Sequence, residues 1–165
     1  MPEQRELVSL AADLLGVLKH GRRRLAVAES CTGGLVGHLL TEVPGSSDVF
    51  VGGAITYDDH LKQQIGVEEK LLEEDGAVSS AVAEAMAAGI RKRSGASLAI
   101  GVTGIAGPNG GSEAKPVGLT YVAVADENGV VSEEHIWQAD RSTNKQLSAQ
   151  AALRLALKRV RETSV

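Results

Sequence analysis

Apolar and polar positions follow each other along the chain with patterns that predict an ordered set of helices and strands. Leucines recur at helical spacing over residues 4–19, and this spacing is typical of an amphipathic helix. Short, almost uninterrupted apolar runs at 25–28 and 98–104 are typical of buried strands. The whole pattern predicts helices over residues 4–19, 32–43, 58–65, 68–74, 78–95 and 141–161, and strands over residues 25–28, 49–57, 98–104, 118–126 and 130–138.

The order of these elements predicts the fold class. Strands alternate with helices early in the chain, and a hairpin around "DENG" comes late. This order favours an α/β fold with helices on both faces of a mixed sheet. Gly52 and Gly53, inside the second strand, indicate a bulge or close packing there. We therefore expect a single three-layer α/β/α domain over residues 1–165, with a mixed sheet and a late β-hairpin.

Composition and charge narrow the range of partners. Aromatic residues are few, so we expect a core of Ala, Val, Leu and Ile. The formal net charge is −4 and no strong basic block dominates, which argues against nucleic acid as a partner. There is no run of ~18 apolar residues and no signal-peptide pattern, so we expect no membrane segment. The single cysteine, Cys31, excludes an internal disulfide and fits a reducing compartment, so we expect a cytoplasmic protein.

The stretch "LAVAESCTGGLVGHLL" at 25–40 places polar and reactive side chains where a strand passes into a helix. Open α/β sheets bind ligands beyond the carboxyl ends of their strands, and a helix start offers unpaired N–H groups. The residues at this position are Glu29, Ser30, Cys31 and Thr32, followed by Gly33 and Gly34, which allow the backbone to approach a ligand. Ser30 could be a nucleophile beside amides that stabilise an oxyanion. Alternatively, Ser30 or Thr32 is an N-cap, and Cys31 is a nucleophile or a small buried apolar residue.

A serine nucleophile needs a base, and the sequence offers a lysine more readily than a histidine. The four histidines are scattered and lack metal-ligand spacing, so we expect no metal site. In "ITYDDHLKQQIG", Tyr57 ends a strand and Lys62 lies one turn into the next helix. Catalysis requires that the pKa of Lys62 falls from ~10.4 to ~7.4, which corresponds to ~4 kcal/mol and can be supplied by burial. The alternatives are an exposed Asp58–Lys62 ion pair and a tyrosine that only packs on the strand.

A glycine-rich loop, "TGIAGPNGGSEAKPVG" at 103–118, follows the third predicted strand. Its glycines are Gly104, Gly107, Gly110 and Gly111. Successive backbone N–H groups in such a loop can bind a phosphate or carboxylate, although the loop is neither a P-loop nor a dinucleotide fingerprint. Thr103 adds a hydroxyl at the strand end, and Asn109 and Ser112 are weaker candidates. The alternative is an irregular connection without a ligand.

Together, five stretches in this order resemble the CinA C-terminal domain family over nearly the whole chain. They are "AESCTGGL" at 28–35, "PGSS" at 44–47, "GGAITYDDHLK" at 52–62, "GAVSSAVAEAMAAG" at 76–89 and "TGIAGPNGG…KPVG" at 103–118. Members with demonstrated activity are nicotinamide-nucleotide amidases, which convert nicotinamide mononucleotide to nicotinic acid mononucleotide and ammonia. The resemblance implies this activity, a small-molecule nucleotide as substrate, no metal or organic cofactor, and a homo-oligomer. Many relatives carry a large N-terminal domain that this chain lacks, so the standalone form is expected.

The resemblance also implies roles for individual residues. Ser30 would be the nucleophile, Lys62 the general base and Tyr57 a proton-transfer or orienting group. The residues implied for substrate binding are Glu29, Cys31, Thr32, Gly33, Gly34, Thr103, Gly104, Ala106, Gly107, Gly110, Gly111 and Arg141. Family members often carry another basic residue, commonly arginine, shortly after "DR". Here that position falls near Lys145, which is a point charge and not a planar fork. Arg141 could also be a surface charge at a helix start.

Two other functions remain open from the sequence. One is a nucleotide-binding domain without turnover, which would act as a sensor or interaction module. The other is an amidase for a different pyridine or aminoacyl substrate. The complete set of Ser30, Tyr57 and Lys62 favours an enzyme over a sensor.

Overall fold

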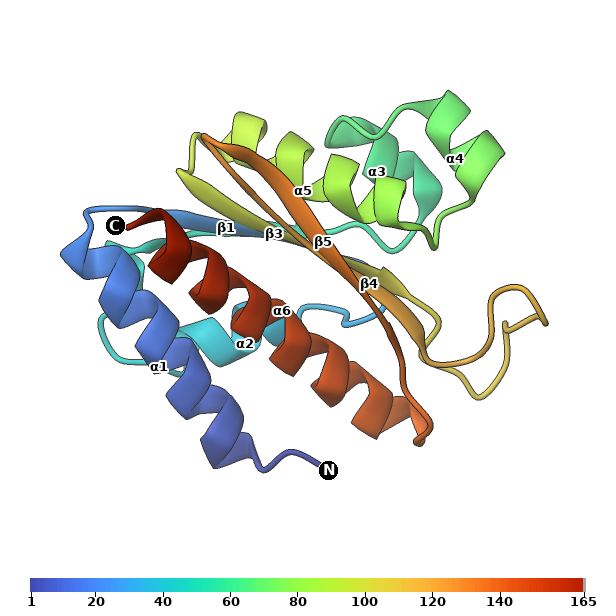
Figure 1. Cartoon of the computed structure of the whole chain (residues 1–165), viewed down its shortest axis with the longest axis horizontal. Helices are drawn as coiled ribbons and strands as arrows, with labels where there is room; N and C mark the ends of the chain where they lie inside the picture. The colour runs from blue at the N-terminus through green and yellow to red at the C-terminus, as the bar shows by residue number, and fades with distance from the viewer. Residues whose placement is uncertain (165) are drawn as a thin grey trace.

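The computed structural model of the chain describes residues 1–164 and contains one five-stranded sheet with helices on both faces (Figure 1). The helices are α1 (Gln4–His20), α2 (Leu35–Thr41), α3 (Asp59–Gln64), α4 (Glu69–Asp75), α5 (Ser80–Ser94) and α6 (Arg141–Thr163), with a short 3₁₀ turn, η1, over Ser46–Asp48. The strands are β1 (Leu25–Glu29), β2 (Phe50–Ile55), β3 (Leu98–Gly104), β4 (Leu119–Asp126) and β5 (Gly129–Ile136). The predicted order of elements is confirmed.

The sheet has the strand order β2-β1-β3-β4-β5. β1 pairs in parallel with both β2 and β3, whereas β3, β4 and β5 pair antiparallel. The predicted mixed sheet with a late hairpin is therefore confirmed. Because β1, β2 and β3 run in one direction, their carboxyl ends meet at one edge of the sheet, and the segments that follow them lie close together.

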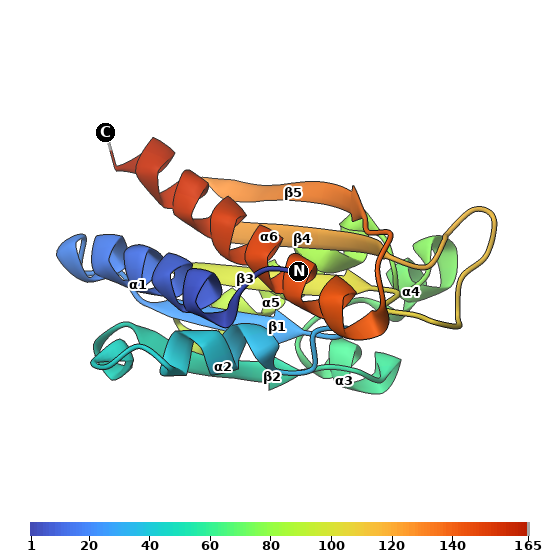
Figure 2. The same ribbon diagram turned by 90° about the horizontal axis from the view of Figure 1, so that it is seen from below.

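The helices form two layers around the sheet. α1, α2 and α6 cover one face, and α5 covers the other together with α3 and α4, as Figures 1 and 2 show. The larger core lies under α1 and α6 and contains mostly Leu and Val, whereas the core under α5 is rich in alanine. α5 approaches the sheet closely at Gly101, where a Cβ atom would lie 2.4 Å from the carbonyl oxygen of Ala83. The predicted three-layer architecture is confirmed.

Some boundaries differ from the sequence prediction. The helix expected from residue 32 begins at Leu35, because Gly33 and Gly34 have φ values of +62° and +100°, which a right-handed helix does not allow. Residues 46–48 form the 3₁₀ turn that the pattern did not predict. The expected irregularity of the second strand is confirmed, since the β1–β2 register shifts between Leu25 and Ala26. Gly53 packs on β1 so closely that a Cβ atom would lie 2.1 Å from the carbonyl oxygen of Val27.

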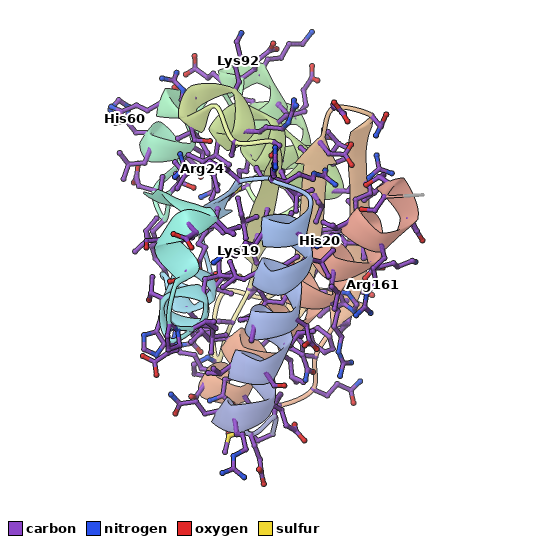
Figure 3. All side chains as sticks on the ribbon, turned by 90° about the vertical axis from the view of Figure 1, so that its left-hand side faces the viewer. Lys19, His20, Arg24, His60, Lys92 and Arg161 are labelled. Carbon is purple, nitrogen blue, oxygen red and sulfur yellow. The ribbon has the colours of Figure 1, made fainter. Side chains whose placement is uncertain are left out.

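The basic side chains labelled in Figure 3 come from different parts of the fold. In Figure 3 the labelled Lys19, Lys92 and Arg161 come from α1, α5 and α6, and they do not gather in one patch. His20 and His60 also lie well apart in this view. Within residues 1–164, no three His, Cys, Asp or Glu side chains are grouped so that they could hold a metal ion. No helix of this part of the chain is both long and apolar enough to cross a membrane.

Candidate active site

A cavity of about 270 Å³ lies at the edge of the sheet where β1, β2 and β3 end. It is lined by residues that follow β1 (Ser30, Cys31) and β2 (Tyr57, Asp59, Lys62), by the α4–α5 connection (Ala77, Val78), by the end of β3 and its loop (Thr103, Gly104, Ile105, Ala106, Gly107, Asn109, Gly110), and by Arg141 at the start of α6. A larger hollow of about 690 Å³ between α4 and α5 contains none of the residues that the sequence singled out. The residues that the sequence predicts for the site therefore gather at the smaller cavity.

Glu29 caps the helix that follows the first strand. Its side chain is 1% exposed, and its carboxylate accepts hydrogen bonds from the backbone N–H groups of Gly34, Val36 and Gly37 at 2.8–3.1 Å and from the Thr32 hydroxyl. These are the unpaired N–H groups that a helix start presents. Neither Ser30 nor Thr32 is the N-cap that the sequence suggested as an alternative. The carboxylate takes over the capping role, and the Ser30 hydroxyl remains free.

Ser30 is held by its backbone while its side chain faces the cavity. Its N–H donates to the Val102 carbonyl at 2.9 Å, and its carbonyl accepts from Gly33 N–H at 3.0 Å. The Ser30 hydroxyl has no hydrogen-bond partner among residues 1–164, and it lines the cavity. The N–H groups of Cys31 and Thr32 donate to no other residue in this part of the chain. The turn thus combines an unpaired hydroxyl with two amides that donate to no other residue, and the Cys31 amide faces the sulfur of its own side chain.

Lys62 is buried, with 1% of its surface exposed. Its Nζ donates to the carbonyl oxygens of Thr56 at 2.8 Å and Tyr57 at 3.2 Å. The expected alternative, an exposed ion pair with Asp58, is wrong, because Asp58 instead caps α3 by accepting from His60 N–H at 2.8 Å. The nearest carboxylate is that of Asp59, at 3.6 Å from Nζ. Burial lowers the pKa of Lys62 below its ordinary value, and the negative charge of Asp59 opposes this shift.

Cys31 lines the same cavity, but its thiol is suppressed as a nucleophile. Burial raises the pKa of the Cys31 thiol to about 12, and the nearby charge of Glu29 acts in the same direction. A reactive cysteine needs a lowered pKa, since the thiolate is the attacking form. The thiol is therefore protonated at neutral pH, and Ser30 is the stronger candidate for the nucleophile.

Arg141 joins two sides of the cavity. Its Nη1 donates to the Gly107 carbonyl at 2.6 Å, and its Nη2 donates to the Tyr57 hydroxyl at 3.3 Å. Tyr57 is 61% exposed, so this contact and not packing orients its ring. Arg141 is thus more than a surface charge at a helix start, because it contacts both the loop and the Tyr57 hydroxyl.

The loop after β3 is anchored at several points. Asn144 Nδ2 donates to the Ala106 carbonyl at 3.0 Å, and Lys115 Nζ donates to the Asp75 carbonyl. The hydroxyl of the buried Thr103 donates to the Ala77 carbonyl at 2.7 Å, so it is already used. The backbone N–H groups of Ala106, Gly107, Asn109 and Gly110 donate to no acceptor in residues 1–164. These N–H groups can bind an anion.

The match to known families agrees with this arrangement. The family model described as the CinA C-terminal domain matches residues 7–160. The chain belongs to the CinA C-terminal domain family. A CinA-like protein of Synechococcus elongatus is 51% identical over 146 residues, which are 86% of this chain and 35% of that protein. A CinA-like protein of Acidobacterium capsulatum is 51% identical over 82% of this chain and 33% of its own length. The chain thus spans about a third of the length of these curated relatives.

Solved CinA structures share the whole fold. The competence/damage inducible protein CihA from Agrobacterium tumefaciens has a TM-score of 0.90 at 38% identity, and the match covers 96% of this chain and 98% of that chain. A competence-damaged protein (CinA) superfamily protein from Escherichia coli has a TM-score of 0.89 at 30% identity, covering 95% and 93%. The mixed sheet and the helix layers are therefore common to these CinA proteins.

The cavity of this CinA domain gathers most, but not all, of the residues predicted for the site. It brings together Ser30, Cys31, Tyr57, Lys62, Thr103, Gly104, Ala106, Gly107, Gly110 and Arg141. It does not include Glu29, Thr32, Gly33, Gly34 or Gly111. The Glu29 carboxylate and the Thr32 hydroxyl are bonded to each other, so the geometry does not favour a direct contact of either side chain with a ligand. Lys145 lies beside the turn, since its Nζ is 3.7 Å from the position that a Cβ atom would occupy if Gly33 had one.

Sequence reasoning missed several residues that line the cavity. Asp59 had a possible signal, since it lies three residues before Lys62 in a helix and so shares its face. Ala77, Val78 and Ile105 carry no chemical signal, and only the tertiary packing of the α4–α5 connection places the first two against the loop. Such apolar lining residues are beyond pattern reasoning because nothing in their type distinguishes them from core residues.

Proposed function

We propose that this protein is an amidohydrolase that converts nicotinamide mononucleotide to nicotinic acid mononucleotide and ammonia, with Ser30 as the nucleophile and Lys62 as the general base. The observation that carries the proposal is the buried Lys62, whose Nζ lies beside a cavity that it shares with an unpaired serine hydroxyl. The resemblance to amidases of the family supports the choice of substrate.

The hydrogen bonds of Lys62 suit a neutral amine. A neutral amine has two N–H donors and one lone pair, whereas an ammonium has three donors. The carbonyl oxygens of Thr56 and Tyr57 accept from Nζ and satisfy two donors. The third position on nitrogen is then a lone pair that can accept a proton. Because burial lowers the pKa of Lys62, the neutral form is more populated near neutral pH than in an exposed lysine.

The proposed reaction proceeds through an acyl-enzyme. Ser30 Oγ attacks the carboxamide carbon while its proton passes to Lys62, and the unpaired N–H groups of Cys31 and Thr32 stabilise the oxyanion. The C–N bond breaks, and Lys62 returns the proton to the leaving nitrogen, which departs as ammonia. Lys62 then removes a proton from water, the hydroxide displaces Ser30 from the ester, and the proton returns to Oγ. No step requires a metal or an organic cofactor.

The remaining part of the cavity suits the nucleotide. The unpaired N–H groups of the loop at Ala106, Gly107, Asn109 and Gly110 would bind the ribose phosphate, and the guanidinium of Arg141 would add a positive charge. Tyr57, held by Arg141, would orient the reacting group at the cavity entrance. The resemblance also supports a homo-oligomer located in the cytoplasm, and light scattering of the purified chain would measure its mass.

The test is ammonia release from nicotinamide mononucleotide by the purified protein without added metal. Ser30→Ala and Lys62→Met are expected to lose activity by at least about 1000-fold, since they remove the nucleophile and the base. Ser47→Ala and Lys70→Met, at exposed positions away from the cavity, are matched controls that keep full activity. Full activity in Lys62→Met would overturn the assignment of the base. Tight binding of the nucleotide without ammonia release would favour the sensor function instead.

A further inference from the structure

We propose that Asp59 is a positioning residue for the base, and that its carboxylate stabilises the ammonium that forms on Lys62 when Ser30 gives up its proton. The inference rests on the proposed function, and it adds a role for a residue that the sequence analysis did not include in the site.

The Asp59 carboxylate lies close to the amine of Lys62. Asp59 Oδ1 lies 3.6 Å from Lys62 Nζ, and Asp59 lines the same cavity as Ser30. This distance is too long for a good hydrogen bond but short enough for an ion pair. The Asp59 side chain is 56% exposed, whereas the Lys62 side chain is 2% exposed. One carboxylate at the rim thus faces a buried nitrogen.

The amine of Lys62 has a third position that neither carbonyl oxygen occupies. The Thr56 and Tyr57 carbonyls accept two N–H groups of Nζ and leave one position over. When Lys62 accepts the proton of Ser30, this position becomes an N–H bond with a full positive charge on the nitrogen. Asp59 provides the nearest negative charge to this group. The carboxylate therefore stabilises the charged state more than the neutral state.

The other charged and titratable groups around Lys62 do not replace Asp59. Asp58, the N-cap of α3, accepts a hydrogen bond from His60 N–H with its carboxylate. Its effect on the pKa of Lys62 is smaller than that of Asp59. From the turn after β1, Cys31 faces Lys62 with a thiol that is protonated at neutral pH. From α6, Lys145 acts on Cys31, and Arg141 is paired with the Tyr57 hydroxyl. Asp59 is thus the group whose removal changes the charge balance of Lys62 most.

The test compares Asp59→Asn with Asp59→Glu and with the exposed control Glu69→Gln. First, the titration of the Lys62 side chain is followed by NMR in protein with isotope-labelled lysine, with Lys62→Met used to assign the signal. In Asp59→Asn the midpoint is expected at lower pH than in the wild type. A unit charge at about 4 Å through a water-like dielectric changes a proton equilibrium by roughly fivefold. Asp59→Glu keeps the negative charge, so its Lys62 midpoint is expected to lie close to that of the wild type. Glu69→Gln is expected to leave the midpoint unchanged.

Second, the pH profile of kcat/KM for nicotinamide mononucleotide is measured for the same variants. The acid limb of Asp59→Asn is expected to move to lower pH while its plateau falls severalfold, because a weaker base is neutral over a wider range but accepts a proton less readily. A merely structural role would lower the rate without moving the limb. An unchanged NMR midpoint in Asp59→Asn would overturn the proposal. If the wild type released no ammonia, the amidase assignment would fail, and the NMR titration would still decide whether Asp59 acts on Lys62.

Discussion

Burial of Lys62 makes the stability of the protein depend on pH in a direction that can be tested with Lys62→Met. Methionine has a similar length and no charge, so it fills the same space without a titratable group. In the wild type, the desolvated ammonium is disfavoured in the folded state, and the pKa of Lys62 is lowered there relative to the unfolded chain. The free energy of unfolding of the wild type therefore carries a dependence on pH that the variant lacks.

The sign follows from proton binding in the two states. Between the lowered pKa of Lys62 in the folded protein and its ordinary value in the unfolded chain, the unfolded chain binds more protons. Stability of the wild type relative to Lys62→Met therefore rises with pH in this window. The slope approaches about 1.4 kcal/mol per pH unit, which is the value for one proton. Below the lowered pKa both states are protonated, and the difference between the two proteins becomes constant.

The assay is urea denaturation of both proteins at a series of pH values from 6 to 10. The quantity of interest is the wild-type free energy of unfolding minus that of Lys62→Met, because this subtraction removes the titration of all other groups. Lys70→Met, at an exposed lysine of α4, is the matched control and is expected to give a flat difference. A flat or falling difference for Lys62→Met would refute the argument that burial disfavours the charged amine. The start of the rise should also coincide with the acid limb of kcat/KM, since both report the same group.

Three further substitutions probe other parts of the framework. Glu29→Ala removes the acceptor of the α2 N–H groups and is expected to lower the free energy of unfolding by about 3 kcal/mol, measured by urea denaturation. Gly101→Ala would place a Cβ atom 2.4 Å from the Ala83 carbonyl and is expected to cost about 2 kcal/mol or more, seen as a lower melting temperature. Arg141→Met breaks the contacts with Gly107 and Tyr57 and removes a charge near the proposed phosphate site. KM for nicotinamide mononucleotide should therefore rise about tenfold or more in steady-state kinetics while the fold is kept. An unchanged free energy of unfolding for Glu29→Ala, an unchanged melting temperature for Gly101→Ala, or an unchanged KM for Arg141→Met would contradict the corresponding contact.

The sequence predicts the fold well because periodicity records burial. Strands buried on both sides, such as 98–104, are continuous apolar runs, and their order with the helices fixes the layers. The predicted helix start at residue 32 was wrong because two glycines with positive φ precede Leu35, and the pattern of apolar residues does not report φ. Boundaries of this kind depend on local backbone geometry that a period of 3.6 residues cannot encode.

The candidate site was only partly predictable for a different reason. Ser30 and Lys62 could be named from residue type and place, but the burial of Lys62 depends on the fold around it and has no local signal. Glu29 was expected to contact a ligand, yet its carboxylate turns to the helix start, because three N–H groups there lack other partners. Asp59 was missed since one of two adjacent acidic residues caps the helix and the other faces the lysine, and the sequence does not say which.

The connection from α2 through η1 enters β2 at the end of the sheet opposite the cavity, since Leu25 and Phe50 pair there while Ser30 and Thr56 follow the other ends of their strands. Extra residues inserted near Ser46–Asp48 would lengthen a surface turn about five strand residues, or roughly 16 Å, away from the reacting groups. A single residue inserted inside α3, between Asp59 and Lys62, would instead rotate the lysine by about 100° relative to the start of the helix. The molecule should thus accept tags, labels or fused peptides at the first position and lose its chemistry at the second.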